Sequence, residues 1–326
     1  MQENDHEPLV AAATSLVHER SAGLSAGAQL KLQQIRGIER ACENLVNRKA
    51  ELSTAAGEMT TAEMVALAEK IAAVKEELRQ ESTLYRWLGR RGLSQTLWVV
   101  LGGKVGAGKS VLAGAITGVP DVVPSRSGRS VSGVSVRIVH DATAAGRRGT
   151  IHLRDGTHQT AEGEEIDEWI ALRDSQRQEL RRYLDVDDAE IRVAYLNHLA
   201  KLFTLIDTAG LIEGRDDDER RLDHAIFHQA DLLLIVDRPE DYREEVTPIN
   251  QVVYDYMATV PAFIILNRTP GNGENCRLRR EELESRGIPA DRILMANCAD
   301  TREVNEHVLV PIFEWLLATN QERIAA

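Results

Sequence analysis

The segment from Gly103 to Ser110 carries the residue types with the most definite chemistry. It reads Gly-Lys-Val-Gly-Ala-Gly-Lys-Ser and matches the pattern G-x-x-x-x-G-K-[ST], between an apolar run and a helical run. Glycines let the main chain curl around a phosphate, and the N-terminus of the following helix adds positive potential. Lys109 would act in catalysis by offsetting phosphate charge, and the Ser110 hydroxyl is placed to bind Mg²⁺. The predicted phosphate-binding residues are Gly103, Gly106, Ala107, Gly108, Lys109, Ser110 and Val111.

A second element, from Phe203 to Gly210, is an apolar run that ends in Asp-Thr-Ala-Gly. A carboxylate at the end of a strand beside the phosphate loop can hold the water shell of Mg²⁺, and the Gly210 amide can contact a γ-phosphate. We therefore predict that Ser110 and Asp207 form the metal site. The segment after Asp207 would then respond to the state of the nucleotide.

Composition limits the remaining possibilities. The chain has 326 residues, enough for about two domains at roughly 150 residues each. With 39 basic and 51 acidic side chains its net charge is -12, which argues against nucleic acid as a partner. Its three cysteines are far apart and form no C-x-x-C pair, as in a reducing compartment or a chain without structural zinc. Without an apolar run of about 20 residues or a secretion signal, we expect a cytoplasmic protein.

The first part of the chain, residues 1–94, has the period of helices. Between about residues 24 and 88 apolar side chains recur three and four positions apart, and Thr60 with Glu63 forms a capping box that would start a second helix. An antiparallel helical hairpin is predicted. We favour packing within the protein over an intermolecular coiled coil, because the strict spacing covers only about two heptads. The two apolar sets are Leu32, Ile35, Ile38, Ala41 and Leu45, and Met64, Leu67, Ile71, Val74 and Leu78.

Residues 95–326 change to short aliphatic runs separated by helical stretches, which predicts an α/β domain with a mostly parallel sheet flanked by helices. An insertion from about residue 149 to 194 should contain a strand and turn, a helix through Trp169, and a strand from Ile191 to Tyr195. A final amphipathic helix is expected from Val304 to Leu317, kinked or shortened at Pro311. The predicted core strands are Leu97–Leu101, Ser135–Val139, Phe203–Ile206, Leu232–Val236, Phe263–Leu266 and Ile293–Met295.

These motifs, in this order, resemble the GTPase domain of the dynamin-like family, in particular a bacterial member. The insertion that carries Leu153–Gly156 and Glu164–Ile166, the preceding helices and the terminal helix also fit that family, and the likeness covers about Gln95 to Thr319. The resemblance implies a Ras-like P-loop NTPase domain that hydrolyses GTP with Mg²⁺. It also implies nucleotide-dependent dimerisation of G domains, or engagement of a longer dynamin-like partner, with peripheral contact to a membrane surface as one alternative.

The candidate base-reading motif departs from the family pattern N/T-K-x-D. Asn267 and Arg268 stand where that pattern expects them, but Pro270 replaces the aspartate that accepts hydrogen bonds from guanine. Either Asn272 or Glu274 compensates, or the preference for guanine is weakened; the resemblance alone favours GTP over ATP. The next base-side loop, Asn297 to Ala299, would place Cys298 near the base, as a small buried filler or as a reactive thiol.

The segment from Pro124 to Gly133 corresponds to switch I, where the resemblance implies a threonine that contacts Mg²⁺ and the nucleophile. This segment contains none, so Ser130 or Ser132 would take its place, and Arg126 or Arg129 would offset developing phosphate charge. The other reading is a flexible Ser/Gly loop with solvated arginines. Leu211 stands where many small GTPases orient water with glutamine, so we expect slow hydrolysis by the monomer and faster hydrolysis when two G domains meet.

Two other functions compete with an enzyme. One is a nucleotide-gated binding module with negligible turnover, and the other is a subunit of a membrane-remodelling dynamin-like assembly. The aromatic and basic cluster Tyr85–Arg91 would contact an anionic membrane or simply end a helix. His224 and His228 are four residues apart, which suits a metal ligand pair or an ordinary helix surface or core pair.

Overall fold

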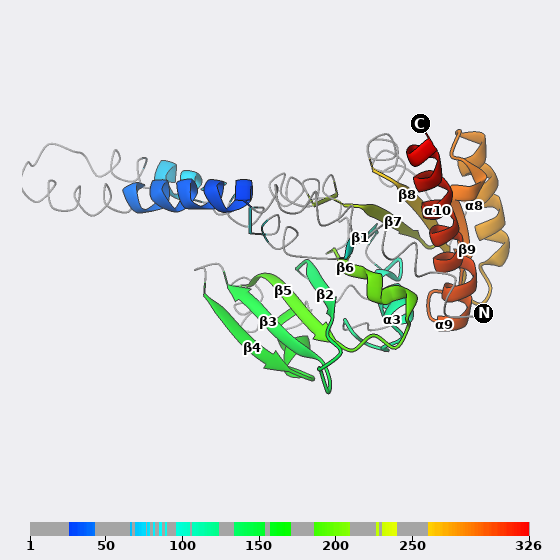
Figure 1. The fold of residues 1–326 in the computed structure, drawn as a ribbon, viewed down its shortest axis with the longest axis horizontal. Helices are drawn as coiled ribbons and strands as arrows, with labels where there is room; N and C mark the ends of the chain where they lie inside the picture. The colour runs from blue at the N-terminus through cyan, green and yellow to red at the C-terminus, as the bar shows by residue number, and fades with distance from the viewer. Residues whose placement is uncertain are drawn as a thin grey trace, which may run out of the picture. The chain divides into compact units, whose positions relative to one another are not determined.

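The computed structural model describes these parts of the chain: residues 26–42, several short pieces between 66 and 89, 96–104, 106–123, 134–153, 157–170, 186–208, 226–227, 230–239 and 260–325 (Figure 1). The chain divides into two compact units. The described residues before 96 belong to one unit, and those from 96 onward belong to the other.

The unit before residue 96 is helical wherever it is described. Residues 26–42 form one continuous helix, and residues 69–75 are helical too. Ala28, Leu32 and Ile35 are buried at the spacing of one helix face, whereas Ile38 is half exposed although it was expected on that face. The capping box of Thr60 and Glu63 lies outside the described residues.

The second unit is built on a nine-stranded sheet in the order β4-β3-β5-β2-β6-β1-β7-β8-β9. Five strands at one end run parallel, and their residues are almost entirely buried because helices cover both faces. These strands are continuous aliphatic runs, as predicted. Their bounds are β1 Leu97–Gly103, β6 Phe203–Asp207, β7 Leu232–Asp237, β8 Ala262–Asn267 and β9 Ile293–Ala296.

The other four strands form a mixed extension. β2 runs antiparallel to β6 and parallel to β5, and β3 and β4 form an antiparallel hairpin beside β5. The returning strand β5 is longer than predicted, because it begins at Val186 rather than Ile191, and β4 was not predicted as a strand. The bounds are β2 Val136–His140, β3 Arg148–Leu153, β4 His158–Glu162 and β5 Val186–Val193, with helix α4 Glu165–Ile170 against the hairpin.

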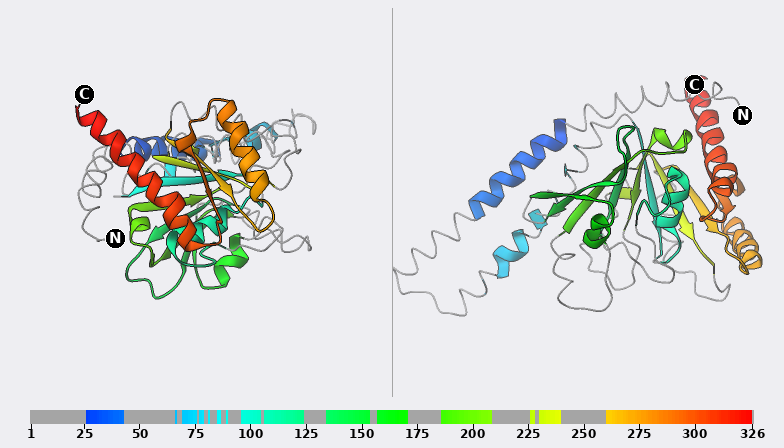
Figure 2. Two further views of the ribbon diagram at one scale, coloured as in Figure 1. Left: turned by 90° about the vertical axis from the view of Figure 1, so that its right-hand side faces the viewer. Right: turned by 90° about the horizontal axis from the view of Figure 1, so that it is seen from below.

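The helices that flank the parallel strands are α3 Lys109–Thr117, α8 Gly273–Ser285, α9 Thr301–Val304 and α10 Val310–Ala325. Figure 2 shows α8 and α10 beside the last strands of the sheet. Buried side chains of α3 and α10 share one hydrophobic core with alternate residues of β1, β7 and β8. The predicted α/β class with flanking helices is therefore confirmed.

The C-terminal helical segment does not stop at Pro311. Residues Asn305–Leu309 form a π-helical turn between α9 and α10, and Pro311 is the second residue of α10. A proline lacks the N–H that a regular helix would bond to the carbonyl four residues earlier. The wider turn lies immediately before it, so the chain remains helical through this point.

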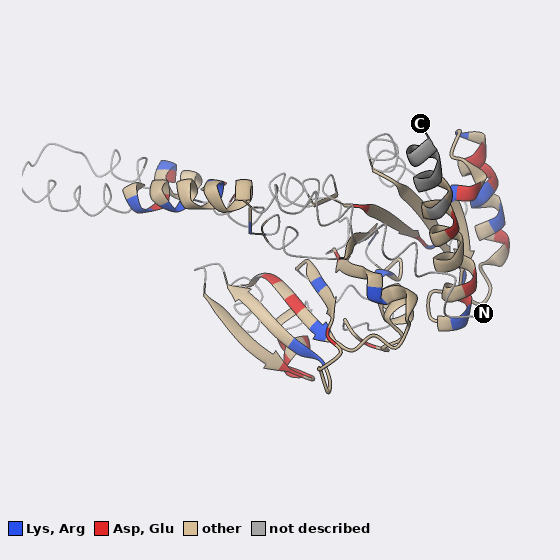
Figure 3. Cartoon of the chain, in the orientation of Figure 1, with Lys and Arg blue, Asp and Glu red and all other residues tan. Residues whose placement is uncertain are grey.

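Charged side chains of the described elements are mixed in sign. Figure 3 shows Lys and Arg interleaved with Asp and Glu along α8 and across β2 and β5. On α8 these residues form ion pairs three and four positions apart, such as Arg280 with Glu284 at 2.8 Å. Across the sheet, Arg137 on β2 pairs with Glu190 on β5, and both side chains are buried.

The packing of α10 on the sheet gives a stability test. Phe313 of α10 is 2% exposed and stacks on Phe203 of β6 with 5.2 Å between ring centroids. We expect Phe313→Ala to lower the free energy of unfolding by about 3–5 kcal/mol, because it removes buried apolar surface and leaves a cavity. Urea denaturation followed by circular dichroism measures the change.

The control is Leu196→Ala, since Leu196 is 70% exposed. That variant should change the free energy of unfolding by less than about 0.5 kcal/mol. Equal destabilisation by the two variants would contradict the placement of Phe313 in the core.

Candidate nucleotide-binding site

The phosphate loop connects the end of β1 to the start of α3, and two of its glycines permit close backbone approaches. Gly103 has φ 139°, and a Cβ there would lie 2.3 Å from the carbonyl oxygen of Val236. Gly108 has φ 107°, and a Cβ there would lie 2.4 Å from Nδ2 of Asn267. Gly106 differs, because no atom lies within 4 Å of its would-be Cβ. The loop therefore packs closely against neighbouring residues at Gly103 and Gly108, whereas there is free space beside Gly106.

The first turn of α3 brings Lys109 and Ser110 to the end of the central strand. Helix α3 has no side-chain cap at Gly108 and no acidic residue in its first turn, which suits an anionic ligand at its N-terminus. Nζ of Lys109 donates to the carbonyl oxygens of Gly103, at 3.2 Å, and Lys104, at 3.1 Å. The ammonium group thus lies along the phosphate loop itself.

Ser110 and Asp207 meet although 97 residues separate them. Parallel pairing of β1 with β6 sets Asp207 opposite Leu101, and Oγ of Ser110 donates to Oδ2 of Asp207 at 2.6 Å. Asp207 is fully buried. A hydroxyl and a carboxylate are the oxygen ligands that Mg²⁺ prefers, so the residues present fit the predicted ion.

Asn267 ties the phosphate loop to the two base-side loops. Its Nδ2 donates to the carbonyl oxygen of Ala107 at 2.8 Å, and its Oδ1 accepts from the backbone N–H of Cys298 at 3.1 Å. The side chain is 6% exposed. Asn267 therefore joins the end of β8, the loop after β9 and the phosphate loop, a positioning role that uses both of its amide atoms.

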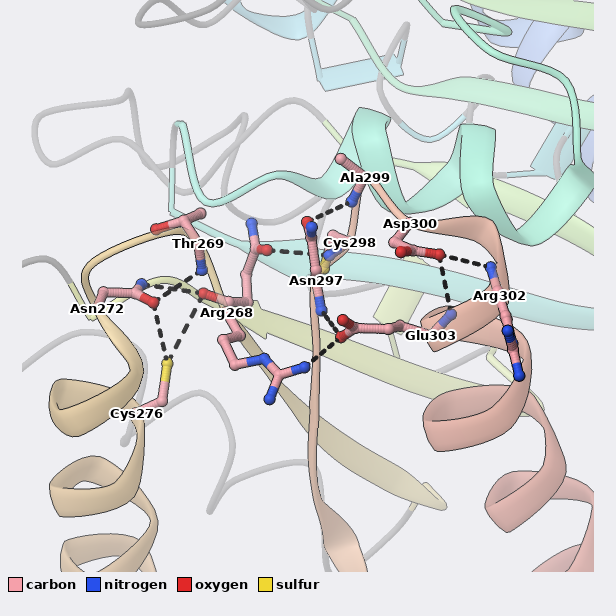
Figure 4. A network of polar contacts seen from close by, with 11 residues as sticks. Arg268, Thr269, Asn272, Cys276, Asn297, Cys298, Ala299, Asp300, Arg302 and Glu303 are labelled. Atoms are coloured by element: carbon pink, nitrogen blue, oxygen red, sulfur yellow. Dashed lines mark hydrogen bonds and ion pairs between the residues drawn. The ribbon is translucent and has the colours of Figure 1, made fainter.

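Arg268 is held by a residue that sequence reasoning missed. Its Nη2 donates to Oε2 of Glu303 at 2.7 Å, and the same oxygen accepts from the backbone N–H of Asn297 at 2.9 Å (Figure 4). The hydrogen bond from Asn297, and then the bond from Arg268, lower the pKa of Glu303. The spacing Asp300-x-x-Glu303 is typical of the start of a helix and could have indicated Glu303, because Asp300 caps α9.

The two residues proposed to compensate for Pro270 have other partners. Oδ1 of Asn272 accepts from the backbone N–H of Thr269 at 2.8 Å, and its Nδ2 donates to the carbonyl oxygen of Asn267 at 3.1 Å. Glu274 forms an ion pair with Arg277 on the exposed side of α8. Asn272 shapes the loop after β8, and Glu274 stabilises the first turn of α8.

Cys298 is a buried filler rather than a reactive group. Burial raises the pKa of its thiol to about 12, and burial also raises the pKa of Cys276. A thiol is nucleophilic only as the thiolate, so neither side chain is activated near neutral pH. Cys298 contributes its backbone N–H to the site through Asn267.

Several predicted residues lie outside the described part of the chain. These are Arg126, Arg129, Ser130, Ser132, Gly210, Leu211, His224 and His228, together with most of the Tyr85–Arg91 cluster. Among the described residues, no group of three or more His, Cys, Asp or Glu side chains could hold a metal ion. No helix in the described ranges is long and apolar enough to cross a bilayer.

The strand, glycine loop, helix and strand-end aspartate define a P-loop nucleotide-binding α/β domain. Residues 99–251 match the family model described as "Dynamin family", a range that contains the phosphate loop, Ser110 and Asp207. This match confirms the resemblance to the dynamin-like family seen in the sequence. Comparison with curated proteins finds no match.

The chain is only weakly similar to the solved structures that it matches. Two structures described as an oligomerised bacterial dynamin pair for sensing and tethering membranes are each 12% identical, with TM-scores of 0.45 and 0.48, and each match covers 84% of this chain but only 44% and 43% of theirs. The chain thus spans less than half the length of those dynamins. A crystal structure of Aquifex aeolicus Era bound to GDP.AlF4- is 14% identical with a TM-score of 0.33, covering 63% of this chain and 52% of Era.

The tie through Asn267 predicts a loss of both stability and binding in Asn267→Ala. That change leaves the Ala107 carbonyl and the Cys298 N–H without partners, which should cost about 1–3 kcal/mol in the free energy of unfolding. Nucleotide affinity should fall roughly tenfold because the phosphate loop loses its support. Chemical denaturation and calorimetric titration measure the two effects.

Asn305→Ala is the matched control, since the Asn305 side chain only accepts a long hydrogen bond, at 3.5 Å, from Asn197. It should leave nucleotide affinity unchanged. Unaltered affinity in Asn267→Ala would show that the phosphate loop keeps its form without this amide.

Burial of the two thiols predicts their resistance to alkylation. At pH 8 in the folded protein, iodoacetamide should modify neither Cys276 nor Cys298, because both are buried and both pKa values are raised. In denaturant both should react. Peptide mapping by mass spectrometry reads the outcome, and rapid modification of Cys298 in the folded protein would contradict its assignment as a filler.

Proposed function

We propose that this chain is a Mg²⁺-dependent nucleoside triphosphatase that binds and hydrolyses GTP through residues 95–326, a G domain that follows a helical region at 1–94. One observation carries the proposal: Ser110 and Asp207 contact each other at 2.6 Å, beside a glycine loop that holds the Lys109 ammonium. Chance would not bring a hydroxyl, a buried carboxylate and a lysine together at the end of one parallel strand pair. The dynamin-family match over residues 99–251 supports GTP as the nucleotide.

The residues divide the work between binding and charge compensation. Ser110 and Asp207 would hold the Mg²⁺ ion, which when bound neutralises charge on the β- and γ-phosphates. Lys109 now donates to two loop carbonyls, and the same three-donor ammonium can turn to phosphate oxygens. We assign the γ-phosphate contact to the Gly210 amide, and charge compensation in switch I to Arg129 with Ser130 or Ser132.

Water orientation is the step that this chain would share with a partner. The side chain of Leu211 has no polar atom to hold the attacking water, so hydrolysis should be slow in the monomer and rise when a second G domain or a longer dynamin-like partner docks. The bacterial dynamin pair that this chain resembles is described as oligomerised and as tethering membranes. A cytoplasmic protein that reaches a membrane surface through such a partner fits the net charge of -12, which does not favour nucleic acid.

Phosphate release measured over a range of protein concentrations tests the proposal. The rate per molecule should rise with concentration, and Lys109→Ala and Ser110→Ala should each lower it at least roughly tenfold, because charge-assisted and metal contacts to phosphate are lost. Lys31→Ala is the control, since Lys31 is exposed on the helix of residues 26–42.

Three outcomes would count against parts of the proposal. A rate per molecule that is independent of concentration would remove the role of a second G domain. Tight GTP binding without phosphate release at any concentration would identify a nucleotide-gated binding module. Unchanged GTP affinity in the Lys109→Ala variant would show that GTP does not bind at the phosphate loop.

A further inference from the structure

The loop after β9, residues 297–300, uses its own backbone donors internally. In a P-loop domain this loop lies on the base side of the nucleotide, where N–H groups can donate to the base. Here the four successive N–H groups all have protein acceptors. Asn297 N donates to Glu303 Oε2 at 2.9 Å, Cys298 N to Asn267 Oδ1 at 3.1 Å, Ala299 N to Asn297 Oδ1 at 3.1 Å, and Asp300 N to the Asn297 carbonyl at 2.9 Å.

Several acceptors of the described base-side loops are engaged in the same way. Oδ1 of Asp300 accepts from the backbone N–H groups of Arg302 and Glu303 at the start of α9. Oε2 of Glu303 accepts from Arg268 and from Asn297, and the amide of Asn272 is bonded within its own loop. At position 270 the side chain is a proline, which has no acceptor atom.

Reading the edge of a purine requires free donors and acceptors, whereas the loop groups named above are already bonded within the protein. Guanine presents an acceptor at O6 and donors at N1 and N2, adenine presents a donor at N6, and hypoxanthine resembles guanine without the 2-amino group. A loop group that must first break an internal hydrogen bond gains little by bonding to a base, since one bond is exchanged for another. The described loops therefore distinguish poorly among the three bases.

A planar cation remains for contact with the base. The guanidinium of Arg268 is about half exposed, and Glu303 fixes its direction through the 2.7 Å bond. A guanidinium plane stacks on aromatic faces. Such stacking tolerates any base, because every base has a π-face.

We propose that the site binds purine nucleoside triphosphates as a class, gripping the phosphates and stacking the base without reading its edge. This inference rests on the proposed function, since it requires a nucleotide at the phosphate loop. GTP, ITP and ATP should bind with affinities within about tenfold of one another, a difference of about 1.4 kcal/mol or less.

Two substitutions should install base reading, each at a different edge. Asn297→Ala removes the Oδ1 acceptor of the Ala299 N–H and leaves that exposed donor for O6, so it should favour GTP and ITP over ATP. Pro270→Asp supplies a carboxylate for N1 and N2, so it should favour GTP over ITP, which lacks the 2-amino group. We expect each preference to change about tenfold or more.

Calorimetric titration of the full chain with Mg²⁺ and the β,γ-imido analogues of GTP, ITP and ATP tests the inference. The control is Ala290→Asp, which adds the same carboxylate at the opposite end of β9, on an exposed residue. It should leave the three affinities in their original ratios, and circular dichroism verifies that all variants are folded.

The outcomes separate this inference from the proposed function. Wild-type affinities within tenfold, with the two predicted shifts, support it. A wild-type preference for GTP clearly above about tenfold over ITP or ATP overturns the inference while leaving the GTPase assignment in place, and so does the absence of a shift in both folded variants. Binding of none of the three analogues overturns the proposed function instead.

Discussion

The amide of Asn267 is the interaction on which the geometry of the site depends. It reaches from the end of β8 to the Ala107 carbonyl in the phosphate loop and accepts from Cys298 in the loop after β9. A glycine at position 108 allows the Asn267 amide to approach the phosphate loop, because any Cβ there would collide with that amide. A buried primary amide with both atoms bonded fixes three loops from distant parts of the chain in one arrangement.

The phosphate side and the base side of the site differ in how they use their polar groups. On the phosphate side, an uncapped helix N-terminus, a lysine and a serine–aspartate pair lie where an anion and its metal would bind. On the base side, Arg268 and Asn297 both donate to Glu303. Charge, rather than base-edge hydrogen bonding, would therefore supply most of the affinity, which agrees with the loss of the usual aspartate at Pro270.

The sequence predicted the parallel core well because buried strands are continuous aliphatic runs. The expected strand Leu232–Val236 falls one residue short of β7, and Ser110 and Asp207 were expected together from motif and strand order alone. The start of β5 was missed because Asp188 and Glu190 interrupt the apolar pattern; Glu190 is buried against Arg137 of β2. The edge strand β4 was missed because most of its side chains are exposed, so no alternation marks it.

Residues of the base side could not be found from motifs. The role of Glu303 depends on contacts with Arg268 and Asn297, which the chain brings together only through the pairing of β8 with β9. Asn272 was named as a candidate base contact, yet its amide supports the loop after β8. In both cases the role depends on the hydrogen-bond partner of a polar side chain, and the spacing of residues along the chain does not predict that partner.

A crystal structure with Mg²⁺ and a nonhydrolysable GTP analogue tests the central claim most directly. The triphosphate should lie against the glycine loop and the first turn of α3, with the Ser110 hydroxyl moved from Asp207 to the ion and the Lys109 ammonium moved to phosphate oxygens. A structure in which the analogue binds elsewhere, while Lys109 and Ser110 keep their present protein partners, would contradict the account.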